Sequence, residues 1–243
     1  MRKILGAAIA AIALQGAATA ALAADSGFTV TPYLWAVGID GDIQAHGEDT
    51  NVSMDFQDVV ENLDMAASAL FEANVGDWVS YAMVDYLSLD TGDVDTRHPG
   101  VDGDLEMDST LATVATVATG YRVHMGERST IDVQVGIRYA QMDTELWIEG
   151  VGQRDADNNV YDGILALRPR LALSRNWTFS PTMSIGAGDS DLTWELSPQF
   201  VYDCDCGFDV RVGYRNLNYD FEKGSDSMDL TIKGPVIGFG FSF

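Results

Sequence analysis

The residues best able to do chemistry are arginines that lie inside stretches of alternating polar and apolar residues. Guanidinium groups form multidentate, weakly hydrated pairs with carboxylates, which suits a crowded and enclosed interior. A strand surface facing water would contain more lysine, yet beyond the first residues only Lys223 and Lys233 occur. Three carboxylates occupy polar positions in the same stretches. We therefore predict a charge network in an enclosed interior, which becomes the lumen if the strands close into a barrel. Its residues are Arg122, Arg138, Arg168, Arg170, Arg211, Arg215, Asp132, Glu195 and Asp209.

The remaining acidic residues gather outside these stretches, where they could bind a divalent cation. Clustered carboxylates repel one another, and calcium prefers oxygen ligands. Asp155, Asp157 and Asn159 resemble the first half of a calcium loop, although Val160 stands where such a loop needs a glycine. We expect these residues to form a solvated acidic surface, and we keep a divalent cation as the one candidate cofactor. Its candidate ligands are Asp102, Asp104, Glu106, Asp108, Asp155 and Asp157.

Histidines and cysteines give little support for catalysis. His46 and His98 lie among many aspartates, and no histidine stands in a readable serine–histidine–acid set. Cys204 and Cys206 are separated by one residue, so an oxidising compartment would favour a disulfide but the bridge would be strained. We expect no enzyme activity, and we keep a hydrolase as an alternative.

The elements that must position these residues are β-strands with period-two alternation. From Ile131 to Tyr139 the apolar residues alternate with Asp132, Gln134, Gly136 and Arg138. Strands of this kind, about 9–11 residues or longer, can cross a bilayer when tilted. The stretch 78–89 alternates poorly, and its faces cannot be assigned. The predicted strands are 28–38, 65–75, 78–90, 105–123, 130–148, 160–174, 176–187, 192–203, 207–221 and 227–243.

The connections between these strands alternate between short and long. Short turns fall near 76–77, 125–127, 175–176 and 205–207, and the longer connections fall at 40–64, 91–104, 149–160 and 222–226, with a short exception at 188–191. An even number of strands with both termini at the short-turn end is typical of a bacterial outer-membrane barrel. We predict an all-β, closed antiparallel transmembrane barrel of about ten strands, with eight or twelve as alternatives. A short helix at 55–63, lying as a plug or on the surface, is predicted in the first long connection.

Composition agrees with export. Arg2 and Lys3 precede an apolar run that ends in Ala21-Leu22-Ala23, which predicts a signal peptide over 1–23 and one barrel domain over 24–243. The remaining chain has 12 basic and 37 acidic residues. A charge near −25 excludes electrostatic binding of nucleic acid.

Aromatic residues are expected in two belts at the headgroup levels of a bilayer. Trp35 belongs to neither belt and shares the polar face with Tyr33. The first belt, at the short-turn end, contains Trp78, Tyr121, Trp177, Tyr202 and Phe208. The second belt, at the long-loop end, contains Tyr86, Trp147, Tyr161, Trp194 and Tyr219.

The last strand resembles the terminal strand of Gram-negative outer-membrane barrels. Phe239, Phe241 and Phe243 alternate to the final position. The resemblance implies that the barrel-assembly machinery reads this strand. The segments 31–35, 38–41 and 56–63 are also similar to a family of uncharacterised proteobacterial outer-membrane barrels, which has no assigned activity. We expect an outer-membrane protein surrounded by lipid, structural or with a narrow pore, and keep cation-dependent adhesion as an alternative.

Overall fold

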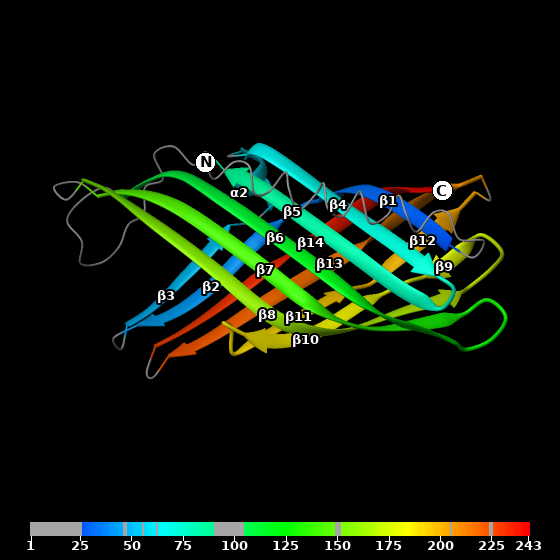
Figure 1. Cartoon of the computed structure of the whole chain (residues 1–243). Helices are drawn as coiled ribbons and strands as arrows, with labels where there is room; N and C mark the ends of the chain where they lie inside the picture. The colour runs from blue at the N-terminus through cyan, green and yellow to red at the C-terminus, as the bar shows by residue number, and fades with distance from the viewer. Residues whose placement is uncertain are drawn as a thin grey trace.

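The chain folds into a closed antiparallel β-barrel of ten strand positions, seen from the side in the computed structural model of Figure 1. The predicted signal peptide over 1–23 lies outside the described residues. Within the described chain, no helix is long and apolar enough to cross a membrane. The structure describes residues 26–45, 48–54, 56–61, 63–89, 105–148, 152–204, 206–223 and 226–243.

Fourteen strands fill ten positions around the barrel, because at four positions two strands lie end to end. The interrupted positions are β1 with β2, β3 with β4, β9 with β10, and β11 with β12. The strands are β1 (Ser26–Trp35), β2 (Gly38–Ala45), β3 (Glu48–Met54), β4 (Leu63–Val75), β5 (Trp78–Leu89), β6 (Leu105–His124), β7 (Thr130–Ile148), β8 (Gly152–Ala172), β9 (Trp177–Phe179), β10 (Thr182–Gly188), β11 (Leu192–Ser197), β12 (Gln199–Asp203), β13 (Phe208–Lys223) and β14 (Asp226–Ser242).

The barrel closes where the last strand meets the first. β14 pairs with β1 from Thr29 opposite Ser242 to Trp35 opposite Val236, and then with β2. On its other side β14 pairs with β13 along its whole length. This closure pairs the first strand with the last, so neither presents an open edge, which would be costly inside a bilayer. The predicted all-β barrel with about ten strands is therefore confirmed.

Short turns and long connections lie at opposite ends of the barrel. At the short-turn end, Gly76 has a φ of 56° in the two-residue turn between β4 and β5, a conformation that glycine adopts without strain. Both ends of the described barrel, Ser26 and Phe243, lie at this same end. Ser26 pairs with Val75 beside that turn, and the backbone N–H of Phe28 donates to the carbonyl of Phe243.

Two of the predicted long connections are shorter than expected. Most of 40–64 forms β2, β3 and a helix, α2 (Phe56–Glu61), and β8 begins at Gly152 instead of at 160. The sequence prediction was wrong there because strands that continue beyond the apolar zone need no apolar face and lose their alternation. The helix lies within the predicted 55–63. It packs against β2 and β3 with Val59 buried and Phe56 half exposed.

Prolines interrupt the barrel wall on three neighbouring strand positions. Pro181 separates β9 from β10, and Pro198 separates β11 from β12, so the continuous strands predicted over 176–187 and 192–203 are each divided. On the adjacent strand, Pro169 lies between Leu167 and Leu171, which pair with β10 and β9 respectively. The described residues 168–170 of β8 have no strand partner on the side that faces β9 and β10. Proline lacks a backbone N–H, so it weakens a ladder at each position where it stands.

The outer wall of the barrel is apolar. On β7 the outward residues Val133, Val135 and Ile137 are exposed, while Asp132, Gln134 and Arg138, which alternate with them, are buried. On β8, Leu165 and Leu167 are exposed and Ala166 and Arg168 are buried. A water-soluble barrel has the opposite arrangement. This surface is suited to lipid.

The described belt residues lie on the outer wall with one exception, and Phe208, Tyr86 and Trp194 among them are partly exposed. Trp78, Tyr121, Trp177 and Tyr202 are exposed near the short-turn end, and Tyr161 is exposed toward the other end. Tyr219 was wrongly placed in the second belt. It is almost fully buried inside the barrel, because β13 directs its odd-numbered residues inward and Tyr219 packs with Val114 and Leu217. The side chain of Trp147 lies outside the described set.

Candidate functional site

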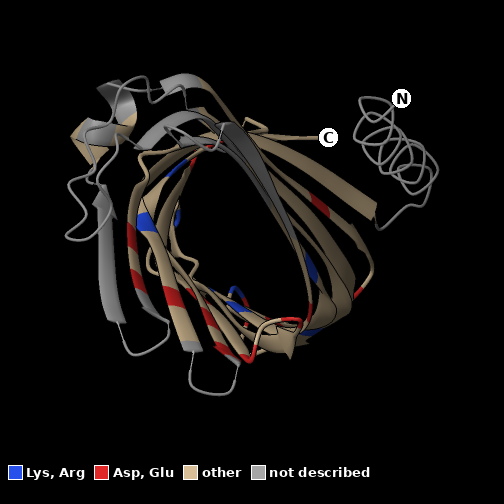
Figure 2. Cartoon of the chain, turned by 90° about the vertical axis from the view of Figure 1, so that its left-hand side faces the viewer, with Lys and Arg blue, Asp and Glu red and all other residues tan. Residues whose placement is uncertain are grey.

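The lumen contains the nine residues that the sequence predicted for a charge network, and the structure brings all nine into ion pairs. They come from β6, β7, β8, β11 and β13 and lie in two groups along the barrel. Looking along the barrel, Figure 2 shows acidic and basic segments on neighbouring parts of the wall. Two carboxylates that the sequence analysis did not include, Glu72 and Asp85, complete the network.

The first group, which we name the Glu72 cluster, lies toward the short-turn end. Glu72 accepts from Arg168 Nη2 at 2.8 Å and from Arg170 Nη2 at 2.5 Å, and its other oxygen lies 2.8 Å from Arg211 Nη1. Arg211 Nε also donates to Asp209 at 2.8 Å. Three guanidinium groups therefore share one buried carboxylate. The Glu72 cluster consists of Glu72, Asp132, Asp209, Arg122, Arg168, Arg170 and Arg211.

Asp132 joins the remaining arginine, Arg122, to this cluster. Arg122 Nε and Nη2 donate to its two oxygens at 2.7 and 2.8 Å, a bidentate pair between opposite residues of β6 and β7. Arg170 Nε lies 3.9 Å from Asp132. The side chain of Asp132 is 1% exposed, so its charge is compensated entirely by these neighbours.

The second group, which we name the Glu195 cluster, lies nearer the middle of the barrel. Glu195 Oε2 accepts from Arg138 Nη2 at 2.5 Å, and Oε1 accepts from Arg215 Nε at 2.8 Å. Arg215 Nη1 also donates to Asp85 Oδ2 at 2.7 Å, and the Tyr33 hydroxyl donates to Asp85 Oδ1 at 2.5 Å. The Glu195 cluster consists of Tyr33, Asp85, Arg138, Glu195 and Arg215.

Hydroxyl groups and an aromatic ring complete the surroundings of these two arginines. Arg138 donates to Thr193 at 3.0 Å and to Ser184 at 2.7 Å. The guanidinium carbon of Arg215 lies 4.2 Å from the centre of the Trp35 ring, a cation–π arrangement. Trp35 and Tyr33 both face the lumen, as the sequence predicted.

Apolar side chains occupy the lumen between and beyond the two clusters. Leu70, Tyr81 and Met83 pack with Ala118 and Ala166 in one group. Val114, Leu217 and Tyr219 form a second group toward the long-loop end, with Trp35 packed against it. Inward-facing apolar residues on β5 explain why the stretch 78–89 alternates poorly.

A small glycine makes room for one of the acids. A side chain at Gly240 would place its Cβ 2.2 Å from Asp209 Oδ2, its neighbour across β13 and β14. Glycine at this position therefore lets the Asp209 carboxylate lie flat against the inner wall and reach Arg211.

The candidate cation ligands are only partly placed. Asp102 and Asp104 lie outside the described residues. Glu106 and Asp108 belong to β6, and Asp155 and Asp157 belong to β8, where Asp157 is opposite Asp143. The calcium-loop resemblance is wrong because residues 152–172 are a continuous strand. Among the described residues, no three histidine, cysteine or carboxylate side chains form a metal-binding group.

Histidine and cysteine residues at the short-turn end have structural partners. His124 Nε2 lies 2.8 Å from Asp77 Oδ1, and the Tyr121 hydroxyl donates to the other oxygen of Asp77. These contacts hold the pKa of Asp77 below its usual value. Cys204 and Cys206 form a disulfide. His46 and His98 lie outside the described residues.

Comparison with known proteins finds similar barrels but no sequence relative. No family model and no curated protein matches the chain. The translocator domain of the autotransporter NalP from Neisseria meningitidis is 13% identical, with a TM-score of 0.46 over 98% of this chain and 97% of that one. The outer-membrane protease OmpT from Escherichia coli is 9% identical, with a TM-score of 0.49 over 91% and 98%. Ail, the attachment invasion locus protein of Yersinia pestis, is 6% identical, with a TM-score of 0.38 over 90% and 99%.

The location of the protein follows from its two surfaces. A closed barrel with an exposed apolar outer wall, aromatic residues toward its ends and a charged interior is the arrangement of a bacterial outer-membrane barrel. The chain is therefore a Gram-negative outer-membrane β-barrel protein.

Proposed function

We propose that the protein is a non-catalytic, structural outer-membrane barrel whose lumen is closed by its own side chains. The observation that carries this proposal is the pairing of every predicted lumen arginine with a buried carboxylate. A conducting pore needs charged groups that face water and remain free to exchange ions. Here the central side chains of Arg138 and Glu195 are 0% and 1% exposed.

Charge compensation also argues against an ion-selective path. The two clusters contain six arginines and five carboxylates, and a sixth buried carboxylate, Asp162, lies opposite Arg138 on β8. Asp162 accepts from the backbone N–H and the hydroxyl of Ser190. Taken together, these groups are balanced, so the lumen has little net charge with which to attract one sign of ion.

Planar-bilayer recording tests the closed lumen. We expect no steady current steps from barrels whose insertion is verified by heat-modifiable gel migration. Steady anion-selective steps that disappear in an Arg168→Ala/Arg170→Ala variant would instead support the narrow pore. The matched control is Arg128→Ala, because Arg128 is exposed in a turn and donates to the carbonyl of Arg175.

A second candidate function is binding of a divalent cation by the outer part of the barrel. The register places Asp157 opposite Asp143 and Asp155 opposite Glu145 on β7 and β8. Like charges at directly opposite positions are destabilising, and a bound cation would relieve this repulsion. Calorimetric titration with calcium tests it. Heat that disappears in an Asp143→Asn/Asp157→Asn variant would support the site, and no heat at millimolar calcium would exclude it.

The last strand, β14, has features of a signal for insertion into the outer membrane. Phe239, Phe241 and Phe243 alternate on the outer wall and are exposed. We propose that they are the signal read by the barrel-assembly machinery. Phe243→Ala, which keeps the backbone hydrogen bonds to Phe28, should slow assembly in cells and leave refolding into detergent unchanged.

A further inference from the structure

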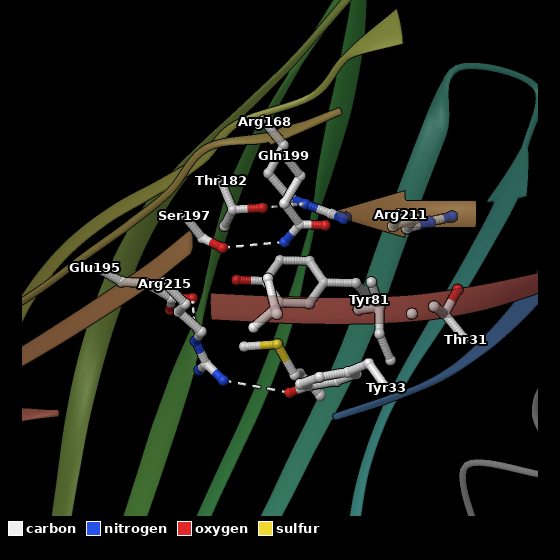
Figure 3. Close-up of a pocket in the computed structure, with 14 residues that line it drawn as sticks. Thr31, Tyr33, Tyr81, Arg168, Thr182, Glu195, Ser197, Gln199, Arg211 and Arg215 are labelled. Atoms are coloured by element: carbon white, nitrogen blue, oxygen red, sulfur yellow. Dashed lines mark hydrogen bonds and ion pairs between the residues drawn. The ribbon is translucent and has the colours of Figure 1, made fainter. Parts of the chain in front are cut away.

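A small cavity lies in the lumen where the two charge clusters approach each other. Its volume is about 30 Å³, enough for one or two particles of the size of water. Figure 3 shows its lining, with Tyr81 extending across it between Arg168 on one side and Tyr33 and Arg215 on the other. Ser197 and Gln199 line the wall beside Pro198.

Two hydrogen-bond donors of this lining lack a partner among the described residues. They are the Tyr81 hydroxyl and Arg215 Nη2, on side chains that are 3% and 2% exposed. The other nitrogens of Arg215 already donate to Glu195 and Asp85. A buried donor without an acceptor costs free energy, so both atoms need an acceptor in the cavity.

A third donor is available at the same place. The Ser197 hydroxyl accepts from Gln199 Nε2 at 3.0 Å, which leaves its own hydrogen free to donate. Figure 3 shows the Tyr81 hydroxyl directed toward the side of the cavity that Ser197, Glu195 and Arg215 form. Thr31 Oγ1 is also unpartnered, but its hydroxyl points away from these groups.

The charges around the cavity favour a negative occupant. Arg168, Arg211 and Arg215 belong to the lining, whereas Glu195 is its single carboxylate. Glu72 and Asp85 pair with these arginines from outside the lining. Both oxygens of Glu195 already accept from guanidinium groups. Asp162, the carboxylate that balances the lumen as a whole, lies beyond Arg138 toward the long-loop end.

We propose that this cavity binds a single halide ion, with chloride as the natural occupant. The ion accepts hydrogen bonds from the Tyr81 hydroxyl, the Ser197 hydroxyl and Arg215 Nη2. A water molecule could accept from the same donors, but it has no charge with which to interact with the three arginines of the lining. The halide joins the Glu72 and Glu195 clusters and stabilises the closed lumen on which this proposal rests.

Thermal unfolding at constant ionic strength tests the site. The full protein, refolded in detergent, is heated in sodium gluconate and in mixtures with increasing sodium chloride. We expect the unfolding midpoint to rise by about 3–5 °C for each tenfold increase in chloride once the site is saturating. An equal midpoint in gluconate and chloride would overturn the proposal.

Tyr81→Phe separates a bound ion from a general salt effect. If the cavity holds chloride, this variant loses the chloride-dependent rise. In gluconate it is at least as stable as the parent, because it removes a buried hydroxyl that has no acceptor there. The matched control is Tyr214→Phe, the same change on the outer wall, where the side chain is 45% exposed. It should keep the rise, and an equal chloride response in both variants would contradict the proposal.

A crystal soaked in bromide gives a readout that does not depend on stability. An anomalous peak within hydrogen-bonding distance of Tyr81 Oη and Arg215 Nη2 is expected. A cavity without such a peak at saturating bromide would overturn the proposal. Because this test reads the ion directly, it can succeed even if bilayer recordings show that the lumen conducts, so the two proposals fail separately.

Discussion

Arg138 and Glu195 meet at the centre of the barrel, with Nη2 of one 2.5 Å from Oε2 of the other and both side chains shielded from solvent. They lie on β7 and β11, which are separated by β8 and β10, so this pair crosses part of the lumen. Arg215 contacts the other oxygen of the same carboxylate from β13. One acid thus links three parts of the wall.

Removing this acid should strongly destabilise the barrel. Glu195→Gln keeps the shape of the side chain but leaves Arg138 and Arg215 without their shared charge. Breaking one partner of a buried pair costs about 3–5 kcal/mol. The unfolding midpoint in urea, measured by heat-modifiable migration, should fall accordingly. Glu127→Gln, an exposed acid in a short turn, is the control and should change little.

Glu72→Gln should loosen the lumen near the short-turn end. Glu72 is shared by Arg168, Arg170 and Arg211, so three cations would lose their common partner. Their repulsion should admit water, and we expect anion-selective current steps in bilayers that the parent protein lacks. Continued silence together with unchanged stability would show that the Glu72 cluster does not close the barrel.

The proline-interrupted part of the wall should open most readily. Pro169, Pro181 and Pro198 lie on neighbouring strand positions, and fewer backbone hydrogen bonds hold them together. In hydrogen exchange, amides within 168–171 and 180–183 should exchange faster than those within 132–138 of β7. Equal protection in the two regions would contradict this expectation.

Tryptophan fluorescence should separate the outer wall from the lumen. Trp78 and Trp177 are 53% and 44% exposed on the outside, whereas Trp35 faces inward beneath Arg215. In variants that keep one tryptophan each, brominated lipids should quench Trp78 and Trp177 but not Trp35. Quenching of Trp35 would mean that its face of β1 is directed toward lipid.

The contact between His124 and Asp77 should make one turn sensitive to acid. Hydrogen bonds from His124 and Tyr121 hold the pKa of Asp77 below its usual value. A carboxyl group with a lowered pKa contributes stability above its unfolded pKa and loses it as the pH falls through the folded value. An NMR titration should therefore show Asp77 protonating below pH 3.8, the usual value. His124→Ala should move the titration upward.

Much of the site could be predicted because alternation reports which face a residue occupies. Arg138, Arg168 and Arg170 are polar residues within apolar runs, and that pattern alone places them on the face opposite the apolar residues. The same reasoning missed Glu72 and Asp85, because the inward neighbours on β4 and β5 are Leu70, Tyr81 and Met83. Counting residues from the turns could have indicated Glu72 as a partner, because Glu72 and Arg211 lie at similar distances from their short turns.

The sequence by itself determined the barrel, its approximate number of strands and the charged character of its interior, because each depends on a local period of two residues and on turn spacing. Only the tertiary structure decided which arginine meets which acid, that Tyr219 faces inward and that a cavity remains beside Tyr81. These features depend on the stagger between strands far apart in the chain. Barrel closure sets that stagger, and no local pattern records it.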